Sequence, residues 1–170
     1  MKVKALDESI IHDIGHAFAY YDYGTEQGLH GAFPSRDVIS AFICGYSRMA
    51  LKSGMLQAMN LKEMFRFFKI MSGGGMGLKE RLNEKKQPYI YVGLVCVRER
   101  YQGQGYMRKV MDMDFAEGNR LGVPVILDTD ARSKCDKYLH LGMELAGMRR
   151  FGEYGTLYDL IKYPDAKQGA

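Results

Sequence analysis

The spacing of apolar and polar positions divides the chain into a mostly helical first half and a second half in which strands and helices alternate. Apolar residues recur at helical spacing in several stretches of the first half, and glycine-rich segments separate these stretches. The pattern predicts a short strand at 2–6 and helices over 7–21, 35–54, 55–71 and 78–83.

In the second half, the run at 89–97 consists of β-branched, aromatic and apolar residues, which is typical of a strand buried on both faces. A helical face follows with Met107, Met111 and Phe115, and Gly122-Val123-Pro124 carries the glycine-then-proline signal of a helix end. The next apolar run, 123–127, completes a strand–helix–strand unit. This unit predicts parallel pairing of its two strands.

A short helix and two more strands are predicted near the end of the chain. Ser133 and Asp136 resemble a capped helix start, and Gly142 is placed to end that helix. Strands at 143–151 and 156–163 then flank a glycine-containing turn. These elements predict an α/β (α+β) fold.

Length and composition agree with one compact domain over 1–170, because the chain has 170 residues and is 46% hydrophobic. No stretch approaches the roughly 20 apolar residues of a membrane-spanning helix, and the first residues do not resemble a signal peptide. The sequence therefore predicts a cytoplasmic protein. The segment 55–71 is a basic amphipathic helix that could touch a membrane surface, but packing on the domain is favoured.

Charge and cysteine content argue against other classes of function. The net charge is +4 and basic residues are mixed with acidic ones, which argues against nucleic acid and is compatible with a small anionic ligand. Cys44, Cys96 and Cys135 are widely spaced, and the pair His12 and His16 lacks a partner carboxylate at the spacing of a zinc site. Neither disulfides nor a metal are predicted.

The segment Arg100-Tyr101-Gln102-Gly103-Gln104-Gly105 connects the predicted strand at 89–97 to the next predicted helix. A glycine-rich turn that enters a helix offers backbone N–H groups that no intrahelical carbonyl accepts, and such groups bind phosphate. A Walker loop is excluded because its Gly-Lys-Ser or Gly-Lys-Thr is missing, and a dinucleotide fingerprint because Arg108 holds the place of its third glycine. Two interpretations of this segment remain: a site for a pyrophosphate, and a tight turn without a binding role.

Two motifs make a family resemblance specific. The strand Gly93-Leu94-Val95-Cys96-Val97, then Arg100-x-x-Gly103-x-Gly105 and a helix, resembles the acetyl-coenzyme A (acetyl-CoA) signature of the GNAT acetyltransferase superfamily. Tyr138-Leu139-His140-Leu141-Gly142-Met143 is similar to the Tyr-x-x-x-Gly-Phe that the family carries near the end of its fold. Within the family, the chain looks closest to the puromycin-acetyltransferase-like branch, to which Ala17-Phe18-Ala19-Tyr20 adds an echo.

The resemblance implies a mixed central sheet with helices on both faces. It also implies that the chain transfers an acetyl group from acetyl-CoA to a primary amine of a small molecule, by direct attack in a ternary complex. Residues 89–163 would then form the coenzyme-binding half, and 1–88 the helical half on the acceptor side. Neither nucleic acid nor a membrane is an expected partner, and a homodimer is left open.

The resemblance also assigns roles to single residues. Tyr138 matches the family's general acid, and the backbone of Val97 is expected to polarise the thioester carbonyl. The coenzyme-binding residues that it implies are Val95, Cys96 and Val97 for the pantetheine arm, Gln102, Gly103, Gln104, Gly105, Tyr106 and Met107 for the pyrophosphate, and Arg100 and Lys134 for further contacts.

The sequence departs from the family pattern at several points. Residues 54–88 show no clear pair of strands, so the N-terminal part of the sheet is predicted to be reduced. Lys134 stands where many relatives have an asparagine, although a lysine can still reach a phosphate. Asp128, Asp130, His140 and water stay open as the general base. The alternative function is therefore a non-catalytic acyl-CoA-binding or sensing module.

Overall fold

The computed structural model describes residues 16, 60–62, 65–66, 69, 73–93, 95–97, 99–152 and 155–166. The strand predicted at 2–6 lies outside the described residues, as do the helix over 35–54 and almost all of the helix over 7–21. Most of the helix over 55–71 also lies outside them, although Leu61, Lys62, Phe65, Arg66 and Lys69 are helical.

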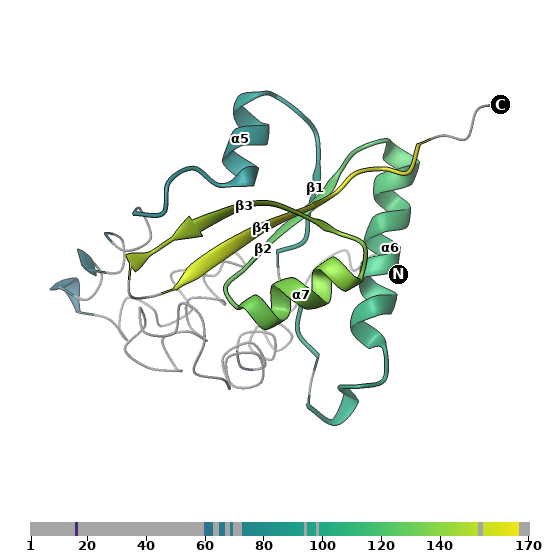
Figure 1. Cartoon of the computed structure of the whole chain (residues 1–170), viewed down its shortest axis with the longest axis horizontal. Coiled ribbons are helices and arrows are strands. Elements are labelled where there is room, and N and C mark those ends of the chain that lie inside the picture. The colour runs from purple at the N-terminus through teal and green to yellow at the C-terminus, as the bar shows by residue number, and fades with distance from the viewer. Residues whose placement is uncertain are drawn as a thin grey trace.

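The described sheet has four strands in the order β1-β2-β4-β3 (Figure 1). Their bounds are Ile90–Tyr91 for β1, Val125–Thr129 for β2, Glu144–Arg150 for β3 and Thr156–Lys162 for β4. β1 runs parallel to β2, whereas β2 and β3 each pair antiparallel with β4. The predicted mixed sheet is therefore confirmed, including the parallel pairing across the strand–helix–strand unit.

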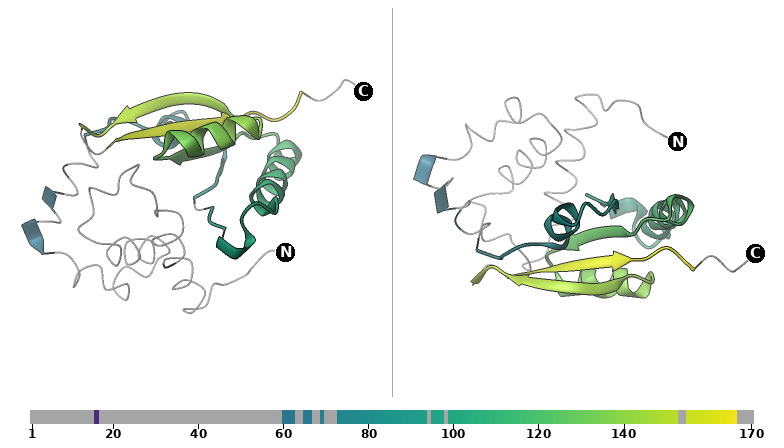
Figure 2. Two further views of the ribbon diagram at one scale, coloured as in Figure 1. Left: turned by 60° about the horizontal axis from the view of Figure 1, so that its bottom comes forward. Right: turned by 90° about the horizontal axis from the view of Figure 1, so that it is seen from above.

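The helices that accompany the sheet in the described part are α5 (Leu78–Glu84), α6 (Tyr106–Leu121) and α7 (Arg132–His140). Figure 1 shows α5 above the strands and α7 below them, and Figure 2 shows α6 standing beside the sheet. Among these described helices, none combines the length and the apolar character needed to cross a membrane.

Successive residues of β2 serve the two faces of the sheet. Val125 and Leu127 belong to a buried cluster that includes Met111 of α6 and Tyr138 of α7. Ile126, which lies between them in the strand, packs instead in the cluster that contains residues of α5. Because side chains alternate along a strand, helices cover both faces of the sheet, as predicted.

β1 is much shorter than the strand predicted at 89–97. It pairs with β2 at only two residues, and the amide of Val92 adds one hydrogen bond to the carbonyl of Ile126 at 2.9 Å. Its two residues are half-buried: Ile90 packs against the cluster that contains Met111, Tyr91 packs against the cluster that contains residues of α5, and the hydroxyl of Tyr91 donates to the Asp128 carboxylate. Beyond Val92 the chain continues to a short 3₁₀ turn, η4 (Glu99–Tyr101).

The predicted cap of the last helix is wrong. α7 begins at Arg132, and its N-cap is Ala131, which has no side-chain hydrogen bond to make. Asp136, expected to complete a cap with Ser133, is ion-paired with Arg132 at 2.9 Å. An ion pair across one helical turn therefore takes the place of the predicted cap.

Candidate functional site

Two glycines give the loop between η4 and α6 its shape. Gly103 and Gly105 have φ angles of +73° and +76°, in the left-handed region that residues with a Cβ rarely adopt. A Cβ at either position would meet no atom within 4 Å, so backbone conformation rather than space requires glycine here. Gly105 is the N-cap of α6, and the loop therefore turns directly into the helix.

Two glutamines brace the same loop against the chain that precedes it. Nε2 of Gln102 donates to the carbonyl of Val97 at 3.1 Å, and Nε2 of Gln104 donates to the carbonyl of Arg100 at 3.0 Å. The sequence predicted only backbone roles for these glutamines. Their side chains hold the turn in position and leave its backbone amides available to a ligand.

The start of α6 is electrically positive. No side chain caps it, and its first turn contains no acidic residue. The first intrahelical bond joins the amide of Lys109 to the carbonyl of Gly105, so the amides of Tyr106, Met107 and Arg108 have no acceptor within the helix. These amides and the dipole of the 16-residue helix favour an anion at this end.

An exposed aromatic pair flanks the loop. The rings of Tyr101 and Tyr106 meet edge to face, with centroids 5.9 Å apart. The guanidinium of Arg100 lies 4.6 Å from the centre of the Tyr101 ring, and Nζ of Lys109 lies 5.2 Å from that of Tyr106. Tyr101 was not among the predicted site residues, although its place within the motif is a signal that could have drawn attention to it.

Among the described residues, β2 is paired along its whole length on one edge and along only part of the other. β4 pairs with all five residues of β2, whereas β1 pairs only with Val125 and Ile126. On the β1 side, no residue in the described ranges pairs with Leu127, Asp128 or Thr129. The stretch 95–97 follows the point where β1 ends, and its residues are not paired with Leu127, Asp128 or Thr129 in the ladder.

The predicted catalytic residue, Tyr138, lies close to parts of the predicted coenzyme site. It is buried on α7, with 8% of its surface exposed, in the cluster against which Val95 and Met107 pack. The structure therefore brings the strand end, the start of α6 and Tyr138 to one place. Cys96 lies half-buried in the same stretch as Val95.

Lys134 would have to give up an ion pair in order to contact a ligand. Its Nζ lies 3.2 Å from Oδ1 of Asp130, and the two side chains are 20% and 6% exposed. A phosphate at Lys134 would have to compete with this largely buried carboxylate. The ion pair also occupies Asp130, which the sequence left open as a general base.

Asp128, the second candidate base, is held in a network on the α5 face. Its Oδ2 accepts from Nη2 of Arg149 at 2.7 Å, and its Oδ1 accepts from the hydroxyl of Tyr91 at 3.1 Å. Burial lowers the pKa of Arg149, but its hydrogen bonds to Asp159 and Asp128 outweigh burial and raise it overall. His140, the third candidate, is exposed on the last turn of α7.

Cys135 is fully buried beside Tyr138 in the same core cluster, and burial raises the pKa of its thiol. A thiol with a raised pKa is a poor nucleophile at neutral pH. In the described part of the chain, no three His, Cys, Asp or Glu side chains lie close enough together to hold a metal ion.

Comparison of the chain with models of protein families finds no match, and comparison with curated proteins finds none either. The residues and the geometry at the start of α6 therefore carry the functional proposal.

Proposed function

We propose that this chain is an acetyl-CoA-dependent N-acetyltransferase of the GNAT type, which acetylates a primary amine of a small molecule. The observation that carries the proposal is the loop 100–105, whose two left-handed glycines lead straight into the uncapped start of α6. Backbone amides there are available to a pyrophosphate, and the helix dipole strengthens the attraction.

The partly paired edge of β2 supports the placement of the pantetheine arm. An extended arm carries amide groups, which can pair with backbone groups along 95–97 and 127–129 as a strand would. This placement directs the thioester toward the backbone of Val97 and the buried side chain of Tyr138. The amide of Val97 would polarise the carbonyl that the amine attacks.

Direct attack by the amine fits the chemistry of Cys135 better than a covalent acyl-enzyme at that residue. Cys135, which lies beside Tyr138, is buried and its pKa is raised, so it stays a thiol. Direct attack needs no protein nucleophile. The proposal therefore has a single chemical step in a complex that contains both substrates.

Tyr138 is proposed to protonate the departing thiolate. An ordinary phenol has a pKa near ~10 and an ordinary thiol near ~8.5, so this type of proton transfer is uphill by about 2 kcal/mol. A general acid of this kind therefore contributes moderately to the rate. Binding of the coenzyme does not depend on it.

A non-catalytic acyl-CoA-binding or sensing module is the second candidate. The observation that favours it is the engagement of the candidate bases: Asp128 is paired with Arg149, and Asp130 with Lys134. A protein that only binds the coenzyme needs no base. His140 and water, the remaining candidate bases, would suffice for the enzyme.

The two candidates differ in thiol release. We expect free thiol to appear from acetyl-CoA when a suitable amine is supplied from a broad panel. Tyr138→Phe should lower kcat about 10-fold to 100-fold while the coenzyme Kd stays nearly unchanged, because the ring still fills its place in the core. Coenzyme binding without thiol release across the panel would favour the sensing module, and an unchanged kcat would remove Tyr138 from the mechanism.

A further inference from the structure

On α6 and α7, the basic residues that have no acidic partner among the described residues lie around the start of α6. Elsewhere on α6 and α7, exposed basic residues are neutralised one turn away: Arg120 by Glu117 at 2.6 Å, and Arg132 by Asp136 at 2.9 Å. The basic residues near the start of α6 differ from these. None of the following forms an ion pair with a residue that the structure describes: Arg108, Lys109 and Lys137.

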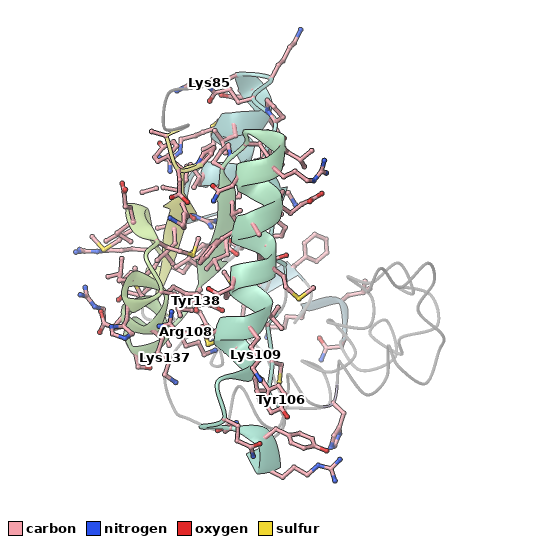
Figure 3. The ribbon with its side chains drawn as sticks, turned by 90° about the vertical axis from the view of Figure 1, so that its right-hand side faces the viewer. Lys85, Tyr106, Arg108, Lys109, Lys137 and Tyr138 are labelled. Carbon is pink, nitrogen blue, oxygen red and sulfur yellow. The ribbon has the colours of Figure 1, made fainter. Side chains whose placement is uncertain are left out.

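Two of these cations come from different helices but lie at the same seam. Met111 and Tyr138 share the buried cluster between α6 and α7. Arg108 precedes Met111 by one helical turn, and Lys137 is the neighbour of Tyr138, so both exposed side chains border this contact. Figure 3 labels Arg108 and Lys137 together on the side of α6 that faces α7.

Lys109 lies on another side of the same turn. Figure 3 labels Lys109 and Tyr106 on the side of α6 opposite the labels of Arg108 and Lys137, and Nζ of Lys109 lies 5.2 Å from the centre of the Tyr106 ring. The arrangement therefore separates a seam pair, Arg108 and Lys137, from a third cation that an aromatic ring already engages.

The seam pair has more positive charge than a pyrophosphate at the helix start requires. Backbone amides and the helix dipole already serve that diphosphate. Coenzyme A carries one more phosphate, a monoester on the 3′ position of its ribose, with a charge of about −1.5 to −2 at neutral pH. A planar arginine fork and a lysine ammonium are well suited to hold such a group.

We infer that Arg108 and Lys137 bind the 3′-phosphate of coenzyme A, and that this contact makes the protein selective for coenzyme A over thioesters that lack the phosphate. The inference rests on the proposed function, because the pyrophosphate at 102–107 brings the ribose to this seam. It adds a basis for donor selectivity that the loop motif does not contain.

The test is calorimetric titration of coenzyme A and of 3′-dephospho-coenzyme A into the full chain. The wild type should bind coenzyme A about tenfold more tightly, since charge-assisted hydrogen bonds to a phosphate are worth roughly this much at an exposed site. The double variant Arg108→Ala/Lys137→Ala should bind the two compounds equally, with its affinity for the dephosphorylated compound unchanged.

A matched control removes the same charge elsewhere. Lys85→Ala/Lys86→Ala also deletes two exposed cations, in this case two lysines, and Figure 3 shows Lys85 at the end of α5, far from Arg108. This control should keep the tenfold preference. Equal binding of both compounds by the wild type, or an unchanged preference in Arg108→Ala/Lys137→Ala, would overturn the inference and leave the proposed function standing. If neither compound binds, the proposed function itself fails.

Discussion

Gly105 and Gly122 occupy equivalent conformations at opposite ends of α6. Their φ angles are +76° and +68°, and a Cβ at either would meet no atom within 4 Å. Only Gly105 adjoins the amides that are proposed to bind the pyrophosphate, because Gly122 caps the C-terminal end. A comparison of variants at the two glycines can therefore distinguish the effect of the left-handed conformation on stability from an effect on ligand binding.

We expect Gly105→Ala and Gly122→Ala to lower the free energy of unfolding by similar amounts, about 1–2 kcal/mol, because each forces a side chain into the left-handed region. Gly105→Ala alone should weaken coenzyme binding, since relief of the strain displaces the first amides of α6. Denaturant unfolding and calorimetry measure the two effects. Equal coenzyme affinity in both variants would argue against a pyrophosphate at this turn.

The loop residues could be predicted because their motif is contiguous in the sequence. Gly103 and Gly105 indicate a turn without any information about the surrounding structure. The hydrogen bond from the side chain of Gln102 to the carbonyl of Val97 could not be predicted, because the direction of a glutamine side chain depends on how the turn is folded. The partner of Lys134 was also missed. Asp130, four residues before Lys134, lies next to it only because α7 begins at Arg132. The predicted cap at Ser133 placed the start of this helix later in the chain, so the contact was not expected.

α6 has a buried face and an exposed face, and Asp114 lies at the border between them. Its carboxyl group is half-buried, and burial raises its pKa. Asp114 makes no hydrogen bond or ion pair with another residue in the described ranges. An ionised carboxylate in this position therefore opposes folding.

Asp114→Asn should raise the free energy of unfolding at pH 7. The pKa of Asp114 is higher in the folded chain than in the unfolded one, so its favourable contribution is complete below the ordinary value of 3.8 and is lost as pH rises through the folded value. The gain in the variant should therefore appear above that range and vanish below it. Urea unfolding at acid and neutral pH measures this difference.

Asp112→Asn is the control for this prediction, because Asp112 is exposed on the same helix. It should change the stability little at either pH. A lower stability of Asp114→Asn at pH 7, or a gain of the same size at acid pH, would contradict the assignment of Asp114 as an uncompensated carboxylate.

The order and type of the described elements followed from hydrophobic periodicity, but their ends did not. The end of α6 was predictable because Gly122 and Pro124 stop a helix through their own backbone preferences. The length of β1 was not, because the partner strand decides where a ladder ends: Tyr91 still pairs with β2, and only one more amide bond follows. The sequence therefore did not predict that β1 leaves Leu127, Asp128 and Thr129 of β2 without a partner in the described ladder.

Asp159 of β4 joins α5 to β3. Its side chain is 3% exposed, and its Oδ1 accepts two N–H groups of Arg149, at 2.8 and 3.1 Å. Its Oδ2 accepts from the amide of Leu78 at 3.2 Å and from Arg81 at 3.5 Å. Partners up to 81 residues apart explain why local patterns gave no sign of this network.

Asp159→Asn should lower the free energy of unfolding by roughly 3 kcal/mol, because it leaves Arg149 largely buried with only Asp128 to balance it. The exposed ion pair of Arg132 and Asp136 provides the control, and Asp136→Asn should cost less than about 0.5 kcal/mol. Denaturant unfolding gives both values. Equal losses in the two variants would show that the network does not tie α5 to the sheet.

The most direct measurement of coenzyme binding at the start of α6 is a ¹⁵N-resolved amide spectrum recorded while coenzyme A is added to the full chain. We expect the amides of 102–107 and 95–97 to shift with a common affinity, and those of β3 to stay in place because this edge strand lies on the far side of β4. Saturation that leaves the amides of 102–107 unmoved, or no binding at all, would contradict the proposed site.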